Sequence, residues 1–179
     1  SNFQILSQSL KQFCDLQVLE LVLDHIHTTK ALLKDLHHLK NLQVLILYYN
    51  INPLDLLSLS MKSPNLKKLI IREHWIYNPA SFNTLAQIPQ TNMTASSLLS
   101  LHLDCCLKIV DEDNAVFFSK FLGFFGQIRD LKLYLSCDGE SYLLNPIAEK
   151  INLMKQLRIL ALGFAVQTGR QIQRFVECM

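Results

Sequence analysis

The chain has 179 residues, of which half are apolar and 18% are charged, and its formal net charge is +2. This composition is too hydrophobic for a disordered chain and too balanced in charge to attract nucleic acid or an anionic membrane. No apolar run approaches the roughly 20 residues that span a bilayer, and residues 1–10 lack the basic and apolar stretches of a signal peptide. We therefore expect no nucleic-acid partner and no membrane partner.

A short leucine motif recurs from near the N-terminus to near the C-terminus. The pattern Leu-x-x-Leu-x-Leu, with Ile at some positions, starts at residues 16, 42, 66, 98, 128 and 157, so successive starts are 26, 24, 32, 30 and 29 residues apart. The last two apolar residues of each motif are two apart and therefore lie on the same side of a strand. The motif predicts six short strands at a repeating interval.

Segments with helical spacing of apolar residues precede and separate these strands. The predicted helices are Phe3–Phe13, Ala31–Leu39, Leu54–Met61, Ser81–Ile88, Ala115–Phe125, Ile147–Met154 and Gln167–Val176. Pro53 suits a helix start, and the carboxylates of residues 111–113 favour the start of the Phe-rich helix. Residues 74–97 are polar and contain prolines, which predicts an extended loop. A strand followed by a helix, about every 28 residues, predicts parallel strands with helices on one side.

The motif resembles that of the leucine-rich-repeat family, whose pattern continues to an Asn or Cys eight residues after the first leucine. Asn50 and Cys106 occupy that position in two repeats, whereas the other four have Asp24, His74, Ser136 and Ala165. The resemblance covers nearly the whole chain from Leu16. It implies an α/β solenoid, a curved horseshoe with a parallel sheet on the concave side and helices on the convex side, and a structural Cys106 buried in a loop. Residues 1–179 would form a single domain of about six repeats. Because the chain does not begin with Met, we expect it to be a segment of a longer protein.

The concave surface follows from the direction of the motif leucines. Since these leucines face the core, the residues between and beside them face the concave side. The predicted surface consists of the third, fifth and seventh motif positions: Val18, Glu20, Val22, Val44, Ile46, Tyr48, Lys68, Ile70, Arg72, Ser100, His102, Asp104, Asp130, Lys132, Tyr134, Ile159, Ala161 and Gly163. An open parallel sheet with exposed Val, Ile and Tyr is unusual unless a partner covers it. Tyr and Arg concentrate binding energy at interfaces. The predicted partner-binding residues are Tyr48, Tyr49, Lys68, Arg72, His102, Asp104, Lys132 and Tyr134.

Motifs for metal binding and catalysis are missing from the sequence. The histidine pairs at 25 and 27 and at 37 and 38 do not place two imidazoles on one helix face. The sequence has no Gly-x-Ser-x-Gly elbow, no phosphate-binding loop and no calcium loop. We predict no catalytic residue, no metal and no cofactor, and we expect that the chain is not an enzyme. The alternative of an enzyme requires a pocket near His102, Asp104 and Cys105.

The five cysteines indicate the compartment. Their number is odd and no Cys-x-x-Cys pair is present, which predicts a reducing environment and a cytoplasmic location. The sequon Asn92-Met93-Thr94 leaves glycosylation open.

The function that we expect is that of a non-catalytic interaction module which binds a protein partner on its concave sheet. The resemblance favours the substrate-recognition array of an F-box ubiquitin-ligase subunit, with an adaptor contacted through regions outside this segment. One alternative is the ligand-sensing leucine-rich-repeat domain of a nucleotide-binding immune receptor. Another is an extracellular receptor segment, which would carry sugar on Asn92 and disulfide-capped ends.

Overall fold

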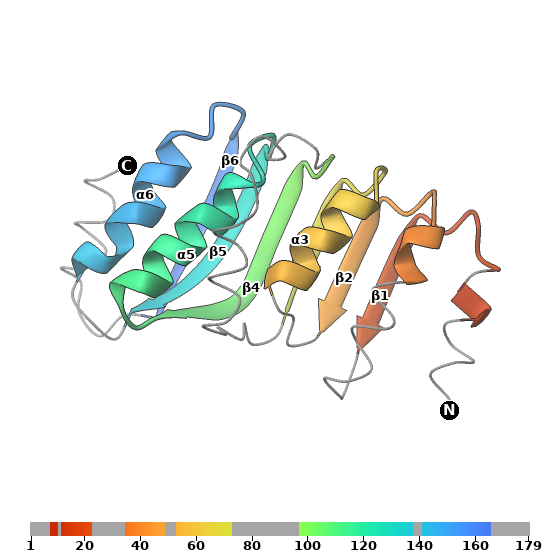
Figure 1. Ribbon diagram of the computed structural model, residues 1–179, viewed down its shortest axis with the longest axis horizontal. Helices are drawn as coiled ribbons and strands as arrows, with labels where there is room; N and C mark the ends of the chain where they lie inside the picture. Colours follow the sequence, from red (N-terminus) through yellow and green to blue (C-terminus); the bar gives the residue numbers. More distant parts are fainter. Residues whose placement is uncertain are drawn as a thin grey trace.

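A computed structural model describes residues 8–10, 12–22, 35–48, 53–72, 97–137 and 141–165. Within these ranges the fold is α/β and contains one parallel sheet with the strand order β1-β2-β3-β4-β5-β6 (Figure 1). The strands are β1 (Val18–Val22), β2 (Val44–Tyr48), β3 (Lys68–Ile71), β4 (Ser100–Ile109), β5 (Asp130–Cys137) and β6 (Ile159–Ala165). Each predicted motif therefore forms a strand, and the prediction of parallel strands is confirmed.

The strands pair in the register that the motif predicts. Their fourth motif positions form one row across the sheet: Leu19, Leu45, Leu69, Leu101, Leu131 and Leu160. In the central strands these leucines are fully buried, whereas Leu19 and Leu160 on the two outer strands are only partly buried. The uneven spacing of the motifs is therefore absorbed by the segments between the strands and not by the sheet.

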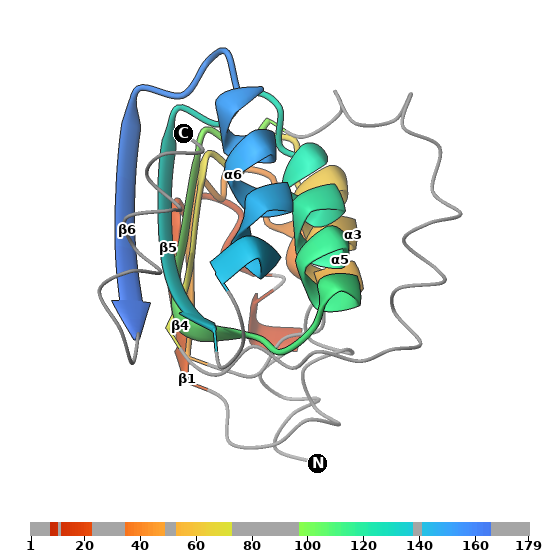
Figure 2. The ribbon, with the colours of Figure 1, turned by 90° about the vertical axis from the view of Figure 1, so that its left-hand side faces the viewer.

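The described helices all lie on one face of the sheet (Figure 2). They are η1 (Leu36–His38), α3 (Pro53–Lys62), α5 (Glu112–Gly123), η3 (Ser141–Leu144) and α6 (Asn145–Asn152). Pro53 begins α3, and Asp111 caps α5 because its Oδ1 accepts a hydrogen bond from Asn114 N at 2.8 Å, as the sequence predicts for both helix starts. The described end of the predicted helix Ala31–Leu39 is a 3-10 turn instead.

Other predictions fall wholly or largely outside the described residues. The helices Ser81–Ile88 and Gln167–Val176 lie there, as does the loop at residues 74–97 except for its last residue. Of the predicted helix Phe3–Phe13, residues 8–10 are helical. No helix in the described part of the chain is long and apolar enough to cross a membrane.

The core fills the space between the sheet and the helices. Five phenylalanines of α5 and the turn after it are buried there: Phe117, Phe118, Phe121, Phe124 and Phe125. The Phe121 ring stacks on Phe118, with centroids 5.9 Å apart, and meets Phe125 edge-on at 5.0 Å. These ring contacts stabilise the end of α5 and the turn after it, and the burial of the five rings packs α5 against the sheet.

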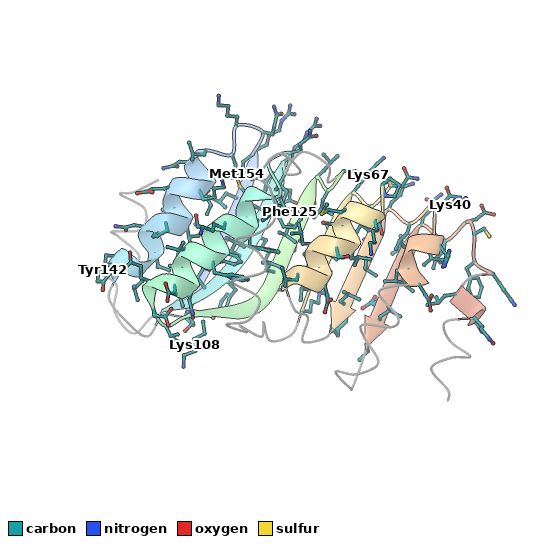
Figure 3. The ribbon with its side chains drawn as sticks, viewed as in Figure 1. Lys40, Lys67, Lys108, Phe125, Tyr142 and Met154 are labelled. Atoms are coloured by element: carbon teal, nitrogen blue, oxygen red, sulfur yellow. The ribbon has the colours of Figure 1, made fainter. Side chains whose placement is uncertain are left out.

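The same tight turn precedes five of the strands. In each turn the first apolar residue of the motif donates its N–H to the carbonyl three residues earlier, at 3.0–3.1 Å: Leu16 to Phe13, Leu42 to Leu39, Leu66 to Ser63, Ile128 to Phe125, and Leu157 to Met154. Asn41 and Asn65 link successive turns, because their amide groups donate to Cys14 O at 3.1 Å and to Lys40 O at 2.6 Å. Lys40, Lys67, Phe125 and Met154 mark these turns along one edge of the molecule (Figure 3). The turns set the register at that edge.

Strand β4 departs from the regular pattern. Leu103 pairs with Leu133, but the next register pair is Cys106 with Tyr134, so Asp104 and Cys105 form a bulge. The strand continues to Ile109. Cys106 therefore lies within β4 and not in a loop, which differs from the position that the family resemblance implies.

Candidate protein-interaction face

We call the face of the sheet opposite the helices the open face (Figure 2). The predicted surface residues occupy the strand positions between the buried leucines. Strand alternation places these residues away from the buried leucines. Several are strongly exposed, including Val22 at 68% and Ile159 at 59%. Ile70 and Ser100 are buried although they lie on this face. Their register neighbours flank them: Ile46 and His102 lie beside Ile70, and Lys68 and Asp130 beside Ser100.

Four of the predicted site residues form a chain of contacts across four neighbouring strands. Arg72 follows β3 directly, and its guanidinium donates a hydrogen bond to the Tyr48 hydroxyl on β2. The Cζ atom of Arg72 lies 5.3 Å from the centroid of the Tyr48 ring. Arg72 Nε lies 3.9 Å from Asp104 Oδ2 on β4, and Lys132 Nζ on β5 lies 2.8 Å from Asp104 Oδ1. Asp104 Oδ1 makes no hydrogen bond of good geometry, so its contact with Lys132 is an ion pair. Asp104 thus holds two cations that come from different strands.

The bulge in β4 helps to place Asp104 between these cations. Lys132 is the register partner of His102, and Asp104 follows two residues after His102 on the same strand. Because Asp104 has no register partner of its own, its carboxylate reaches both Arg72 and Lys132. Bulges commonly re-aim a side chain in this way.

A second polar cluster lies beside the first and joins β4 to β5. Asp130 Oδ2 accepts a hydrogen bond from Ser100 Oγ at 2.9 Å and lies 2.8 Å from His102 Nε2. Ser100 Oγ is 3.2 Å from the same His102 nitrogen. His102 therefore pairs with Asp130, whereas the alternative enzyme hypothesis places it with Asp104.

The surroundings of Asp130 favour its ionised form. Partial burial alone would raise the pKa of Asp130, but the hydrogen bonds from His102 and Ser100 outweigh it, together with the charges of His102 and Lys68. The pKa of Asp130 is therefore lower than that of an ordinary aspartate.

A hollow of about 340 Å³ lies next to these clusters on β4, β5 and β6. It is mostly apolar and is lined by Asp104, Lys132, Leu133, Tyr134, Ala161, Leu162 and Gly163. The Tyr134 ring leans over Gly163, its register partner, and a Cβ atom at residue 163 would lie 2.3 Å from Tyr134 Cδ2. The absence of a side chain at Gly163 therefore allows the ring to take this position.

The structure brings together most, but not all, of the predicted site residues. Tyr48, Arg72, Asp104 and Lys132 form the chain of contacts, Tyr134 lines the hollow beside it, and His102 and Lys68 lie around Asp130. Tyr49 lies outside the described residues, and the side chain of Cys105 is not described.

Ser100, Asp130 and Gly163 are not among the partner-binding residues that the sequence predicts. All three occupy surface positions of the motif, so the motif pattern is the feature of the sequence that points to them. Among the described residues, no three His, Cys, Asp or Glu side chains gather as metal ligands. No protein-family model matches the chain, and no curated protein matches it either.

Proposed function

We propose that the chain is a leucine-rich-repeat solenoid and that it acts as a non-catalytic interaction module, with a protein partner bound on the open face. The solenoid is supported by the consecutive order of the parallel strands, the turn that recurs before five of them, and the helices on one side. Neighbour-to-neighbour stacking of this kind is typical of repeat proteins.

One observation carries the binding proposal. No described helix covers the open face, which nevertheless exposes Val18, Val22, Tyr134 and Ile159. Parallel sheets are almost always covered on both faces, and exposed apolar patches mark interaction sites. Tyr134 and Arg72 on this face are of the residue types that concentrate binding energy at interfaces.

The geometry of Ser100, His102 and Asp130 argues against catalysis by these residues. A nucleophilic triad needs one histidine nitrogen toward the serine and the other toward the carboxylate. Here both partners meet the same nitrogen, His102 Nε2, and the serine donates its proton to Asp130. This arrangement differs from that of a triad, which favours a structural or binding role for the cluster.

Site-specific photo-crosslinking tests the binding proposal. A photoreactive residue replaces Val22 or Ile159 on the open face, or Leu153, which is 69% exposed in the turn after α6, as the matched control. In cells that make the full protein, we expect the same partner to crosslink from positions 22 and 159 and not from 153. A partner captured only from position 153 would contradict the proposal.

The cellular setting is proposed from the sequence resemblance and the cysteine content. We propose a cytoplasmic substrate-recognition array of the F-box type. Co-purification of the full-length protein with a ubiquitin-ligase adaptor is the expected result. A glycan on Asn92 or a set of disulfides would instead favour the extracellular receptor alternative.

A further inference from the structure

We infer that the partner presents an acidic side chain next to an apolar one, with the carboxylate bound by the exposed donors of Arg72 and Lys132 and the apolar group in the hollow beside Tyr134. This inference rests on the proposed function, because it specifies the chemistry of a partner on the open face. It follows from how charge and apolar surface are arranged there.

In the cluster around Asp104 and Asp130, the cations are more exposed than the carboxylates. The Arg72 and Lys132 side chains are 43% and 49% exposed, whereas those of Asp104 and Asp130 are 24% and 27% exposed. Asp104 is engaged by Arg72 and Lys132, and Asp130 by His102 and Ser100. An approaching partner therefore meets the cations first, and complementary charge on the partner is negative.

Hydrogen-bonding capacity points in the same direction. A guanidinium has five N–H donors and an ammonium has three, and neither accepts a hydrogen bond. Their contacts with Tyr48 and Asp104 use only part of this capacity. A carboxylate can accept several N–H donors at once, which makes it a fitting partner for a closely spaced Arg and Lys.

The hollow adds an apolar requirement at the same place. Its lining is mostly apolar and includes Tyr134 and Ala161, while Asp104 and Lys132 belong both to the hollow and to the ion-pair chain. A carboxylate at Lys132 and an apolar group in the hollow therefore lie next to each other. An apolar anchor seated in a pocket beside a charged contact is the usual form of an interface hot spot.

A protein segment fits this combination better than nucleic acid does. The net charge of the chain is only +2, which gives little long-range attraction for a phosphate backbone. The carboxylates of Asp104 and Asp130 would also repel successive phosphates, whereas a single acidic side chain needs only the exposed donors of Arg72 and Lys132.

Selection from a library of short random peptides tests the inference on the full chain. Peptides are kept if they bind the native protein and lose affinity for at least one of two open-face variants, Tyr134→Ala and Arg72→Glu/Lys132→Glu. The matched control is Lys62→Glu/Lys155→Glu, which carries the same charge change at exposed positions in α3 and in the turn after α6. Circular dichroism and thermal melting establish that each variant is folded.

We expect the selected peptides to share an Asp or Glu close to a large apolar residue. They should bind the native chain at least about tenfold more tightly than Arg72→Glu/Lys132→Glu, and equally to the control variant. Replacing the peptide acid by Lys should abolish binding to the native chain and restore binding to Lys132→Glu.

Three outcomes would overturn the inference. Peptides that depend on Tyr134 but lack acidic residues would overturn it and leave the proposed function standing. A single-stranded oligonucleotide that displaces the peptides and itself requires Arg72 and Lys132 would make nucleic acid the better partner. If no peptide depends on any open-face residue, the proposed function and the inference both fail.

Discussion

Gly163 lies beneath the aromatic ring of Tyr134, so close that a methyl group at residue 163 would lie 2.3 Å from Tyr134 Cδ2. The two residues are register partners on β5 and β6. A ring that covers a glycine on the neighbouring strand is a known way to compensate for the missing side chain. The relationship links strand pairing to the shape of the hollow on the open face.

Replacing Gly163 by Ala should therefore move the Tyr134 ring and destabilise the fold. We expect a loss of about 1–2 kcal/mol in the free energy of unfolding, as for other overpacked sites, measured by urea denaturation. The double variant Tyr134→Ala/Gly163→Ala should not show this additional loss, because the colliding ring is gone. If the changes in the free energy of unfolding of the two single variants add up to that of the double variant, the position of the Tyr134 ring does not depend on Gly163.

Truncation of Phe121 should weaken the core of α5. Its ring is fully buried and contacts Phe118 and Phe125. We expect Phe121→Ala to reduce the free energy of unfolding by about 3–5 kcal/mol. Phe13→Ala is the matched control, because Phe13 is 55% exposed and its loss should change stability by less than about 0.5 kcal/mol. Similar effects at both positions would contradict the described packing.

The link between successive turns depends on the amide group of Asn65. Asn65→Asp keeps the shape of the side chain but removes the N–H that reaches Lys40 O. We expect a loss of about 1 kcal/mol in the free energy of unfolding, the usual value for one hydrogen bond. Gln156→Glu is the control, because Gln156 holds the same position of the motif but its side chain makes no hydrogen bond within the described part of the chain. An equal loss in the free energy of unfolding for both variants would indicate that the added charge, and not the lost hydrogen bond to Lys40 O, is responsible.

The lowered pKa of Asp130 makes its contribution to stability dependent on pH. In the unfolded chain an aspartate has a pKa of about 3.9, and the folded-state pKa of Asp130 lies below the ordinary value. The ionised form therefore stabilises the fold above about pH 4, and this stabilisation is lost as the pH falls through the folded-state pKa. Because the side chain is partly exposed, we expect Asp130→Asn to cost no more than about 1 kcal/mol at pH 7.

The pH dependence of that difference is the decisive measurement. Urea denaturation of the native chain and Asp130→Asn at a series of pH values should give curves that converge below about pH 4. A difference that persists unchanged in acid would mean that the substitution acts through packing and not through the charge of Asp130.

The sequence was sufficient to predict the strands because each motif leucine has one place in the sheet. Leu45, Leu69, Leu101 and Leu131 recur at the same motif position and pair with one another in the structure. The start of α5 could also be predicted, since a carboxylate directly before a segment with helical spacing is typical of a helix N-terminus. Both features follow from residue types at short and regular spacing within each repeat.

The details of the open face were less accessible because they depend on contacts between strands. The bulge at Asp104 and Cys105 leaves the alternation of Leu101 and Leu103 intact, so the sequence pattern contains no sign of it. The pairing of His102 with Asp130 and not with Asp104 depends on the directions of their side chains. The burial of Ile70 likewise depends on what flanks it on β2 and β4.

The strand order has a consequence for how the molecule comes apart. Each described strand pairs only with those adjacent to it along the chain, and within the described part of the sheet β1 and β6 have one partner each. Opening of either outer strand therefore leaves the remaining ladder unbroken. Amide hydrogens of β1 and β6 should exchange with solvent sooner than those of β3 and β4. Stretching the chain by its ends should peel strands away one after another from the outside.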